Sequence, residues 1–252
     1  MTGQEKAQVV LILGSGPNVV QAADWPKDWF DQIVVINNAW RVRHDWDTLV
    51  FPEDFPADRR PQKVTQGQQV VEADQFVPAQ NRFGGFVHAG ATMAYTTAYW
   101  VLAALQPAVM AFMGCDMTYA QAGKSHFYGK GTADPLRDDV SLRDLGAKSA
   151  RLALIAAEQG CTCVNLSRDP SALLFPRAEP EGLRRRLLSL DLDGKRYGDL
   201  RAREEALGYS TPDGRHDALA GHVDLGAMDT LDRDWRSLFA KSLSEQGGTD
   251  AG

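Results

Sequence analysis

The sequence has few cysteines, no excess of basic charge and no long hydrophobic run. Three cysteines occur in 252 residues, and Cys161-x-Cys163 has neither the spacing of a zinc-binding pair nor that of a redox CxxC motif. With 27 basic and 33 acidic residues, the net charge of −6 argues against a general nucleic-acid binder, which needs a basic surface. No apolar stretch approaches the roughly 20 residues that span a membrane, so we expect no transmembrane segment.

The amino terminus and the composition predict a cytoplasmic protein. The first residues, MTGQEKAQ, lack the basic segment, apolar stretch and cleavage site of a signal peptide. Hydrophobic residues make up 44% of the chain and charged residues 24%, which excludes a wholly disordered chain. We therefore expect a soluble globular protein with reduced cysteines.

The density of charge changes along the chain near residue 178. From Glu179 onward 26 of 74 residues are charged, against 34 of the first 178. The sequence predicts a nucleotide-binding domain over residues 1–178 and a charged helical subdomain with a frayed tail over residues 179–252. Spaced leucines predict helices at 183–192, 200–207 and 231–243, which we expect to offer a surface for homo-oligomerisation.

Short apolar runs alternate with helical segments in the first part of the chain. The runs are residues 9–13, 33–36, 48–51, 108–113 and 161–166, and the expected helices are 92–105 and 149–159. Continuous apolar runs are typical of strands that are buried on both faces, and their alternation with helices favours a parallel sheet. The sequence therefore predicts an α/β fold, Rossmann-like and doubly wound, with a mainly parallel sheet and a C-terminal helical appendage.

A glycine-rich turn follows the first run. We call this segment, Gly14-Ser15-Gly16-Pro17-Asn18, the glycine turn. Glycines let the backbone approach a phosphate, and a helix that begins near Pro17 directs its free N–H groups at an anion. The third glycine of the dinucleotide-binding motif and the GK[ST] of a P-loop are both absent. A phosphate site and a plain strand-to-helix turn account for the segment equally well.

Two further segments occupy the same edge of the predicted sheet. Asn37 and Asn38 follow the second run, where an amide suits a nucleobase or a ribose hydroxyl, although a turn-capping pair is the simpler alternative. Gly90 and Thr92 precede the alanine-rich helix and could hold an anion or a sugar. N-capping of that helix by Thr92 is an equally good interpretation.

The densest group of reactive side chains follows the fourth run. Gly114 and Asp116 come at the end of that run, and His126, Tyr128 and Lys130 follow on a glycine-flanked loop. Histidine is the natural general base near neutral pH. Tyrosine and lysine can stabilise the charge on a departing phosphate. The sequence therefore predicts a catalytic loop beside the glycine turn, in a scheme that requires no metal.

The order of these motifs over residues 8–178 resembles that of the bacterial sialyltransferases that use CMP-sialic acid. It is also similar to that of proteins of unknown function related to an archaeal 6-hydroxymethylpterin diphosphokinase. The resemblance implies that the glycine turn and Asn37 or Asn38 contact the nucleotide. It also implies that Gly114-x-Asp116 matches a GxD motif and that residues 125–129 match a catalytic loop.

The chain departs from that family in the glycine turn, where Ser15 and Asn18 replace an asparagine and a serine, and near Pro52 or Glu53, where an asparagine is missing.

Two further departures concern the catalytic residues that the resemblance implies. Lys130 stands where the family has its catalytic histidine, and Thr118 stands where a tyrosine helps the phosphate to leave. Tyr119, one position later, could replace that tyrosine. Because a lysine has a reference pKa of about 10.4, it is protonated near neutral pH and cannot be the base. The resemblance therefore implies His126 as the base and Lys130 as a phosphate clamp.

The resemblance implies a nucleotide-sugar glycosyltransferase that uses a CMP-type donor, inverts configuration and requires no metal or other cofactor. One alternative is an ATP- and Mg²⁺-dependent diphosphokinase of a pterin-like alcohol, in which Asp116, Glu53 or Asp54 holds the ion through oxygen ligands. Another is a non-catalytic nucleotide-binding or assembly protein, in which the charged helices after residue 178 bind a partner. In each case the expected partner is a nucleotide and not a nucleic acid.

Overall fold

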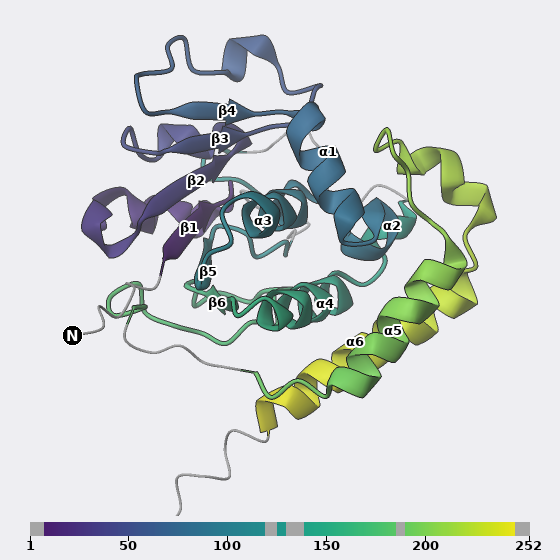
Figure 1. Ribbon diagram of the computed structural model, residues 1–252. Coiled ribbons are helices and arrows are strands. Elements are labelled where there is room, and N and C mark those ends of the chain that lie inside the picture. Colours follow the sequence, from purple (N-terminus) through teal and green to yellow (C-terminus); the bar gives the residue numbers. More distant parts are fainter. Residues whose placement is uncertain (1–7, 119–124, 130–138, 185–189, 245–252) are drawn as a thin grey trace, which may run out of the picture.

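A six-stranded parallel sheet forms the centre of the computed structural model, which describes residues 8–118, 125–129, 139–184 and 190–244 (Figure 1). The strand order is β4-β3-β2-β1-β5-β6. The chain runs outward from β1 to β4 and then returns to add β5 and β6 on the other side of β1. This reversal confirms the expected Rossmann-like, doubly wound α/β fold. The strands are β1 Val9–Leu13, β2 Gln32–Ile36, β3 Thr48–Val50, β4 Gln69–Val71, β5 Val109–Met113 and β6 Thr162–Asn165.

The central strands are buried on both faces. Ile12 of β1 is level with Val34 of β2 on one side and with Phe112 of β5 on the other. Every residue of β1 and of β5 is buried, which explains why both appear in the sequence as continuous apolar runs. The edge strand β4 does not form a continuous apolar run, because it is short and begins with the exposed Gln69.

Two kinds of helix cover the sheet. In Figure 1, α1, α3 and α4 lie on one side of the sheet, and α5 and α6 pack outside α4. The α-helices are α1 Ala73–Arg82, α2 Gly85–Ala89, α3 Met93–Ala104, α4 Leu145–Glu158, α5 Gly194–Leu207 and α6 Leu225–Ser244. The short 3₁₀ helices are η1 Pro17–Asp24, η2 Lys27–Trp29, η3 Asn37–Arg41, η4 Ala57–Arg59, η5 Val140–Leu142 and η6 His216–His222.

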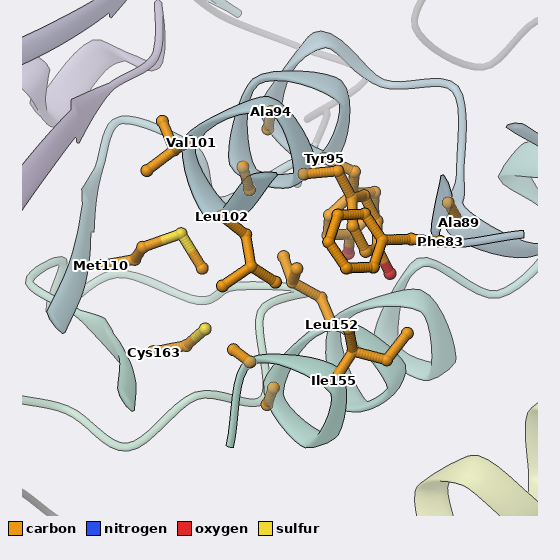
Figure 2. Close-up of a cluster of buried hydrophobic side chains, with 14 of the residues drawn as sticks. Phe83, Ala89, Ala94, Tyr95, Val101, Leu102, Met110, Leu152, Ile155 and Cys163 are labelled. Carbon is orange, nitrogen blue, oxygen red and sulfur yellow. The ribbon is translucent and has the colours of Figure 1, made fainter. Parts of the chain in front are cut away.

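Each face of the sheet has its own hydrophobic cluster. On the α-helical side, Leu102 of α3 points toward Leu152 of α4, beside Met110 of β5 (Figure 2). Residues 94–102 of α3 are all buried, because this helix lies between the sheet and the other helices. On the opposite side, Val19 of η1 and Ala39 of η3 belong to a second cluster with the other side chains of the strands.

The C-terminal helices share the main core. Tyr197 of α5 and Trp235 of α6 belong to the same hydrophobic cluster as α3 and α4. The expected helices at 200–207 and 231–243 fall within α5 and α6, which both begin earlier. The expected helix at 183–192 is wrong in its described part. Leu183 lies in a turn after Gly182, whose φ is +86°, and residues 190–193 are not helical.

Candidate active site

A cavity of about 690 Å³ opens at the carboxyl ends of the strands, where the strand order reverses. Ligands of open parallel sheets bind at this position. Its walls come from the glycine turn, η3, the loop after β3, the start of α3 and the segment after β5. The sequence-predicted residues along its wall are Gly14, Ser15, Gly16, Pro17, Asn18, Asn37, Asn38, Thr92, Gly114, Asp116, His126 and Tyr128.

The glycine turn packs directly against the turn that follows β5. Gly14 donates a backbone hydrogen bond to Met113 (2.8 Å), and Gly16 donates one to Gly114 (2.8 Å). A Cβ on Gly16 would lie 2.8 Å from the Gly114 carbonyl oxygen, closer than real Cβ atoms approach an oxygen. Gly114 has φ +71°, and a Cβ there would lie 2.7 Å from the Cβ of Val19. Close packing and the positive φ of Gly114 therefore account for these glycines without a ligand.

A buried polar network holds Asp116 at the base of the cavity. The Nδ2 atom of Asn18 lies 2.7 Å from Asp116 Oδ2, 2.8 Å from Ser167 Oγ and 3.0 Å from Asp169 Oδ2. Asn165 of β6 donates a longer bond of 3.3 Å to Asp116 Oδ1. Asp116 therefore orders the turns after β1, β5 and β6 as well as lining the cavity.

Asn37 and Asn38 present unmet hydrogen-bond acceptors. Asn37 has φ +52°, a left-handed conformation that asparagine tolerates better than most residues. Asn38 is 3% exposed. The Oδ1 atoms of both side chains are buried and find no hydrogen-bond partner among the described residues. Because an unmet buried acceptor costs about 1–3 kcal/mol, these amides favour a ligand that donates hydrogen bonds.

The histidine loop, residues 125–129, is attached to the glycine turn. The backbone N–H of Phe127 donates a hydrogen bond of 3.1 Å to the carbonyl oxygen of Ser15. Within the loop, His126 and Gly129 exchange two backbone hydrogen bonds of 3.0 Å each. Phe127 packs against the hydrophobic cluster that contains η1. The loop thereby holds His126 and Tyr128 at the cavity wall.

His126 has the chemistry of a neutral imidazole. Its ring is half-buried, and burial lowers its pKa below the ordinary value of 6.5. The Nδ1 atom lies 2.9 Å from Ser125 Oγ, and the ring stacks on Tyr128 with a centroid separation of 5.0 Å. In the tautomer whose Nδ1–H donates to Ser125 Oγ, Nε2 carries no hydrogen and can accept a proton from a ligand. Near neutral pH this histidine can act as a general base.

The other predicted residues divide into three groups. Thr92 lines the cavity and also caps α3, because its Oγ1 accepts a hydrogen bond of 3.3 Å from the backbone N–H of Tyr95. Gly90 has φ +87°, and a Cβ there would lie 2.8 Å from the ring of Tyr95, so it shapes the bend before α3 without lining the cavity. Tyr119 and Lys130 lie outside the described residues.

Two charged residues at the cavity wall were not predicted from the sequence. Arg59 ends η4, and Asp169 follows β6. Neither belongs to a recognisable motif, and only the fold brings them to the same edge as the glycine turn. Asp54 also lines the cavity, as its place after the third strand suggests. Within the described part of the chain, no three His, Cys, Asp or Glu side chains gather as a metal site.

The cysteine at the cavity wall is not a nucleophile. Cys115 lines the cavity but is only 4% exposed, and burial raises the pKa of its thiol well above the ordinary value. Because the thiolate is the reactive form, a protonated buried thiol is inert. His126 is therefore the better candidate for chemistry at this wall.

Comparison with models of protein families, with curated proteins and with solved structures finds no match for this chain. No described helix combines the length and the apolar character that crossing a membrane requires.

Proposed function

We propose that the cavity binds a nucleotide sugar with a CMP-type donor group and that the protein transfers the sugar to an acceptor hydroxyl. The observation that carries this proposal is the hydrogen bond from Phe127 to Ser15, which joins the histidine loop to the glycine turn. A candidate base and a candidate phosphate site thereby share one cavity. The cavity volume of about 690 Å³ falls in the usual range of small-molecule sites.

The proposed reaction uses His126 as general base. The acceptor hydroxyl oxygen attacks the anomeric carbon of the sugar and forms a new C–O bond. The bond between that carbon and the phosphate oxygen breaks, and its electron pair leaves with the nucleotide. The hydroxyl proton passes to Nε2 of His126, whose lowered pKa keeps it unprotonated near neutral pH.

The remaining groups bind and orient the donor. In the glycine turn, Gly14 and Gly16 already donate their backbone N–H groups to Met113 and Gly114. Among the described contacts, the N–H groups of Ser15 and Asn18 are the ones left for a phosphate. The amides of Asn37 and Asn38 suit the nucleoside. Tyr128 lines the cavity and supplies a hydroxyl that can stabilise charge on the leaving phosphate, and Asp116 orders the turn after β5. Lys130, the expected phosphate clamp, follows this loop directly in the sequence.

Diphosphate transfer from ATP is the second candidate, and the acidic wall of the cavity favours it. Asp54, Asp116 and Asp169 all line the cavity without gathering as a three-ligand metal site, and only the last two share the amide of Asn18. Carboxylate oxygens are the ligands that Mg²⁺ prefers. This reaction predicts a response to ATP that depends on Mg²⁺, whereas sugar transfer from CMP predicts a cytidine response without it.

Thermal unfolding with CMP, CDP, UDP and ATP, each with and without Mg²⁺, distinguishes the candidates. A ligand at 100 times its dissociation constant stabilises a protein by about 2.7 kcal/mol, so binding raises the unfolding temperature measurably. Stabilisation by CMP that is independent of Mg²⁺ supports the donor assignment. Stabilisation by ATP that occurs only when Mg²⁺ is present supports the diphosphokinase. The absence of a response to any cytidine nucleotide contradicts the donor assignment.

A further inference from the structure

Arg59 has no role in the proposed sugar transfer. This residue lines the cavity and is half-buried. Among the described residues that line the cavity, it is the only arginine or lysine. Its guanidinium makes no hydrogen bond or ion pair to another residue that the structure describes.

The guanidinium of the neighbouring Arg60, in contrast, has partners within the protein. Arg60 donates hydrogen bonds of 3.1 and 2.9 Å to the carbonyl oxygen of Phe55, and its guanidinium lies 4.5 Å above the ring of Phe51. Arg59 has no comparable protein partner in the described chain. Its planar donors therefore remain available for a carboxylate or a phosphate, which a guanidinium binds through paired hydrogen bonds.

Arg59 belongs to the part of the cavity wall that is formed by the loops after β2 and β3. Its carbonyl oxygen accepts a hydrogen bond of 2.9 Å from the indole of Trp40, so η4 is joined to η3, which begins at Asn37. The glycine turn follows β1, two strands away from β3. Neighbouring strands lie about 4.8 Å apart, so the two loops leave the sheet about 10 Å from one another.

The charged side chains of the cavity wall, other than Arg59, are acidic among the described residues. Asp54, Asp116 and Asp169 line the same cavity, and an anionic ligand is repelled by each of them. Asp54 is the nearest of these in sequence to Arg59, and it is exposed. In the described wall, Arg59 supplies the one side-chain charge that attracts an anion.

We propose that Arg59 binds an anionic group of the ligand, a phosphate or a carboxylate, that is separate from the phosphate at the glycine turn. This inference rests on the proposed function, because it requires a nucleotide in the cavity. It adds that the ligand carries negative groups at two places. Such a group is either a phosphate on the ribose or the carboxylate of an acidic sugar.

Calorimetric titration of the full chain with three probes tests the inference. Cytidine 5′-monophosphate has one anionic group, whereas cytidine 3′,5′-bisphosphate and CMP-N-acetylneuraminic acid each carry a second. We expect Arg59→Gln to weaken binding of at least one two-anion probe by about 10- to 100-fold and to change the CMP affinity less than about twofold. The probe that loses affinity identifies the source of the second anion.

Two further variants control for charge. Lys63→Gln removes the same charge from an exposed position on the loop after β3 and should change no affinity more than about twofold. Asp54→Asn removes the opposing charge and should strengthen binding of the same probe. An equal loss for all three probes, or no loss for any, overturns the second anionic site. Failure of every probe to bind the wild-type protein instead refutes the proposed function, and this inference with it.

Discussion

The backbone N–H of Phe127 lies 3.1 Å from the carbonyl oxygen of Ser15, although 112 positions separate them in the sequence. This hydrogen bond joins the histidine loop to the glycine turn. Phe127 also packs its ring into the cluster beneath η1, so the attachment has a polar and an apolar part. The side chains on either side, His126 and Tyr128, are thereby held at the cavity.

Replacing His126 tests its role as base. We expect His126→Gln to lower the rate of CMP release from CMP-N-acetylneuraminic acid at least about 100-fold, because a positioned base contributes about 10²–10⁴. The dissociation constant for CMP should change less than about twofold. His44→Gln, at an exposed histidine away from the cavity, should leave both values unchanged. A rate that is insensitive to His126→Gln would show that another group takes the proton.

The pH dependence of the same reaction follows from the lowered pKa of His126. Burial places that pKa below 6.5, so the imidazole is already neutral at pH 7. The rate should therefore be level between pH 7 and 8 and should fall as the imidazole becomes protonated below about pH 6.5. Initial rates of CMP release measured from pH 5 to 8 give this profile. A rate that rises from pH 7 to pH 8 would contradict the assignment, because it would require a base with a higher pKa.

The sheet could be predicted from the sequence because its central strands are buried on both faces. Continuous apolar runs such as residues 9–13 permit few other interpretations. The edge strand β4 could not be predicted, because it begins with the exposed Gln69 and only its last residue, Val71, is buried. The helix expected at 183–192 illustrates the opposite error, since spaced leucines indicate a helix even where the chain turns at Gly182.

Several of the predicted site residues could be found because they closely follow a strand. Two other site residues could not be found in this way. Strand ends of a parallel sheet meet at one edge, so Gly14, Asn38 and Asp116 reach the same cavity. Arg59 and Asp169 reach it through loops whose paths depend on tertiary packing. That Arg59 has no ion-pair partner among the residues the structure describes cannot be read from a sequence, because it depends on which carboxylates the fold brings near.

Gly114→Ala tests whether the contact between the turns after β1 and β5 is essential. Gly114 and Gly160 have nearly equal φ angles, +71° and +73°, but only Gly114 is crowded. Gly160→Ala should cost about 1 kcal/mol, the strain of a left-handed alanine. Gly114→Ala should cost about 1–3 kcal/mol more, because its Cβ meets Val19. Urea unfolding of both variants measures the difference, and equal losses would show that the turns can separate freely.

Glu204→Gln tests how the C-terminal helices are held on the core. Glu204 of α5 is 3% exposed and lies 2.7 Å from the buried Arg151 of α4, and the Trp235 indole donates to it over 2.8 Å. Burial alone would raise the pKa of Glu204, but the charge and hydrogen bonds of Arg151 outweigh burial and lower it to about 2. Removing one charge of a buried pair costs about 3–5 kcal/mol, so this variant should be much less stable at pH 7.

The same pKa fixes how that loss depends on pH. Because the pKa of folded Glu204 lies below the ordinary value of 4.5, the ion pair stabilises the fold fully above about pH 4.5. Its contribution declines as the pH falls from there toward about 2. Urea unfolding at pH 7, 5 and 4 should therefore show a large difference in the free energy of unfolding between wild type and Glu204→Gln at pH 7 and 5. That difference should begin to narrow at pH 4.

The exposed neighbour provides the matched control, since Glu205→Gln should change stability by no more than about 0.5 kcal/mol. Equal effects of the two variants at pH 7 would show that the buried pair does not hold α5 against α4.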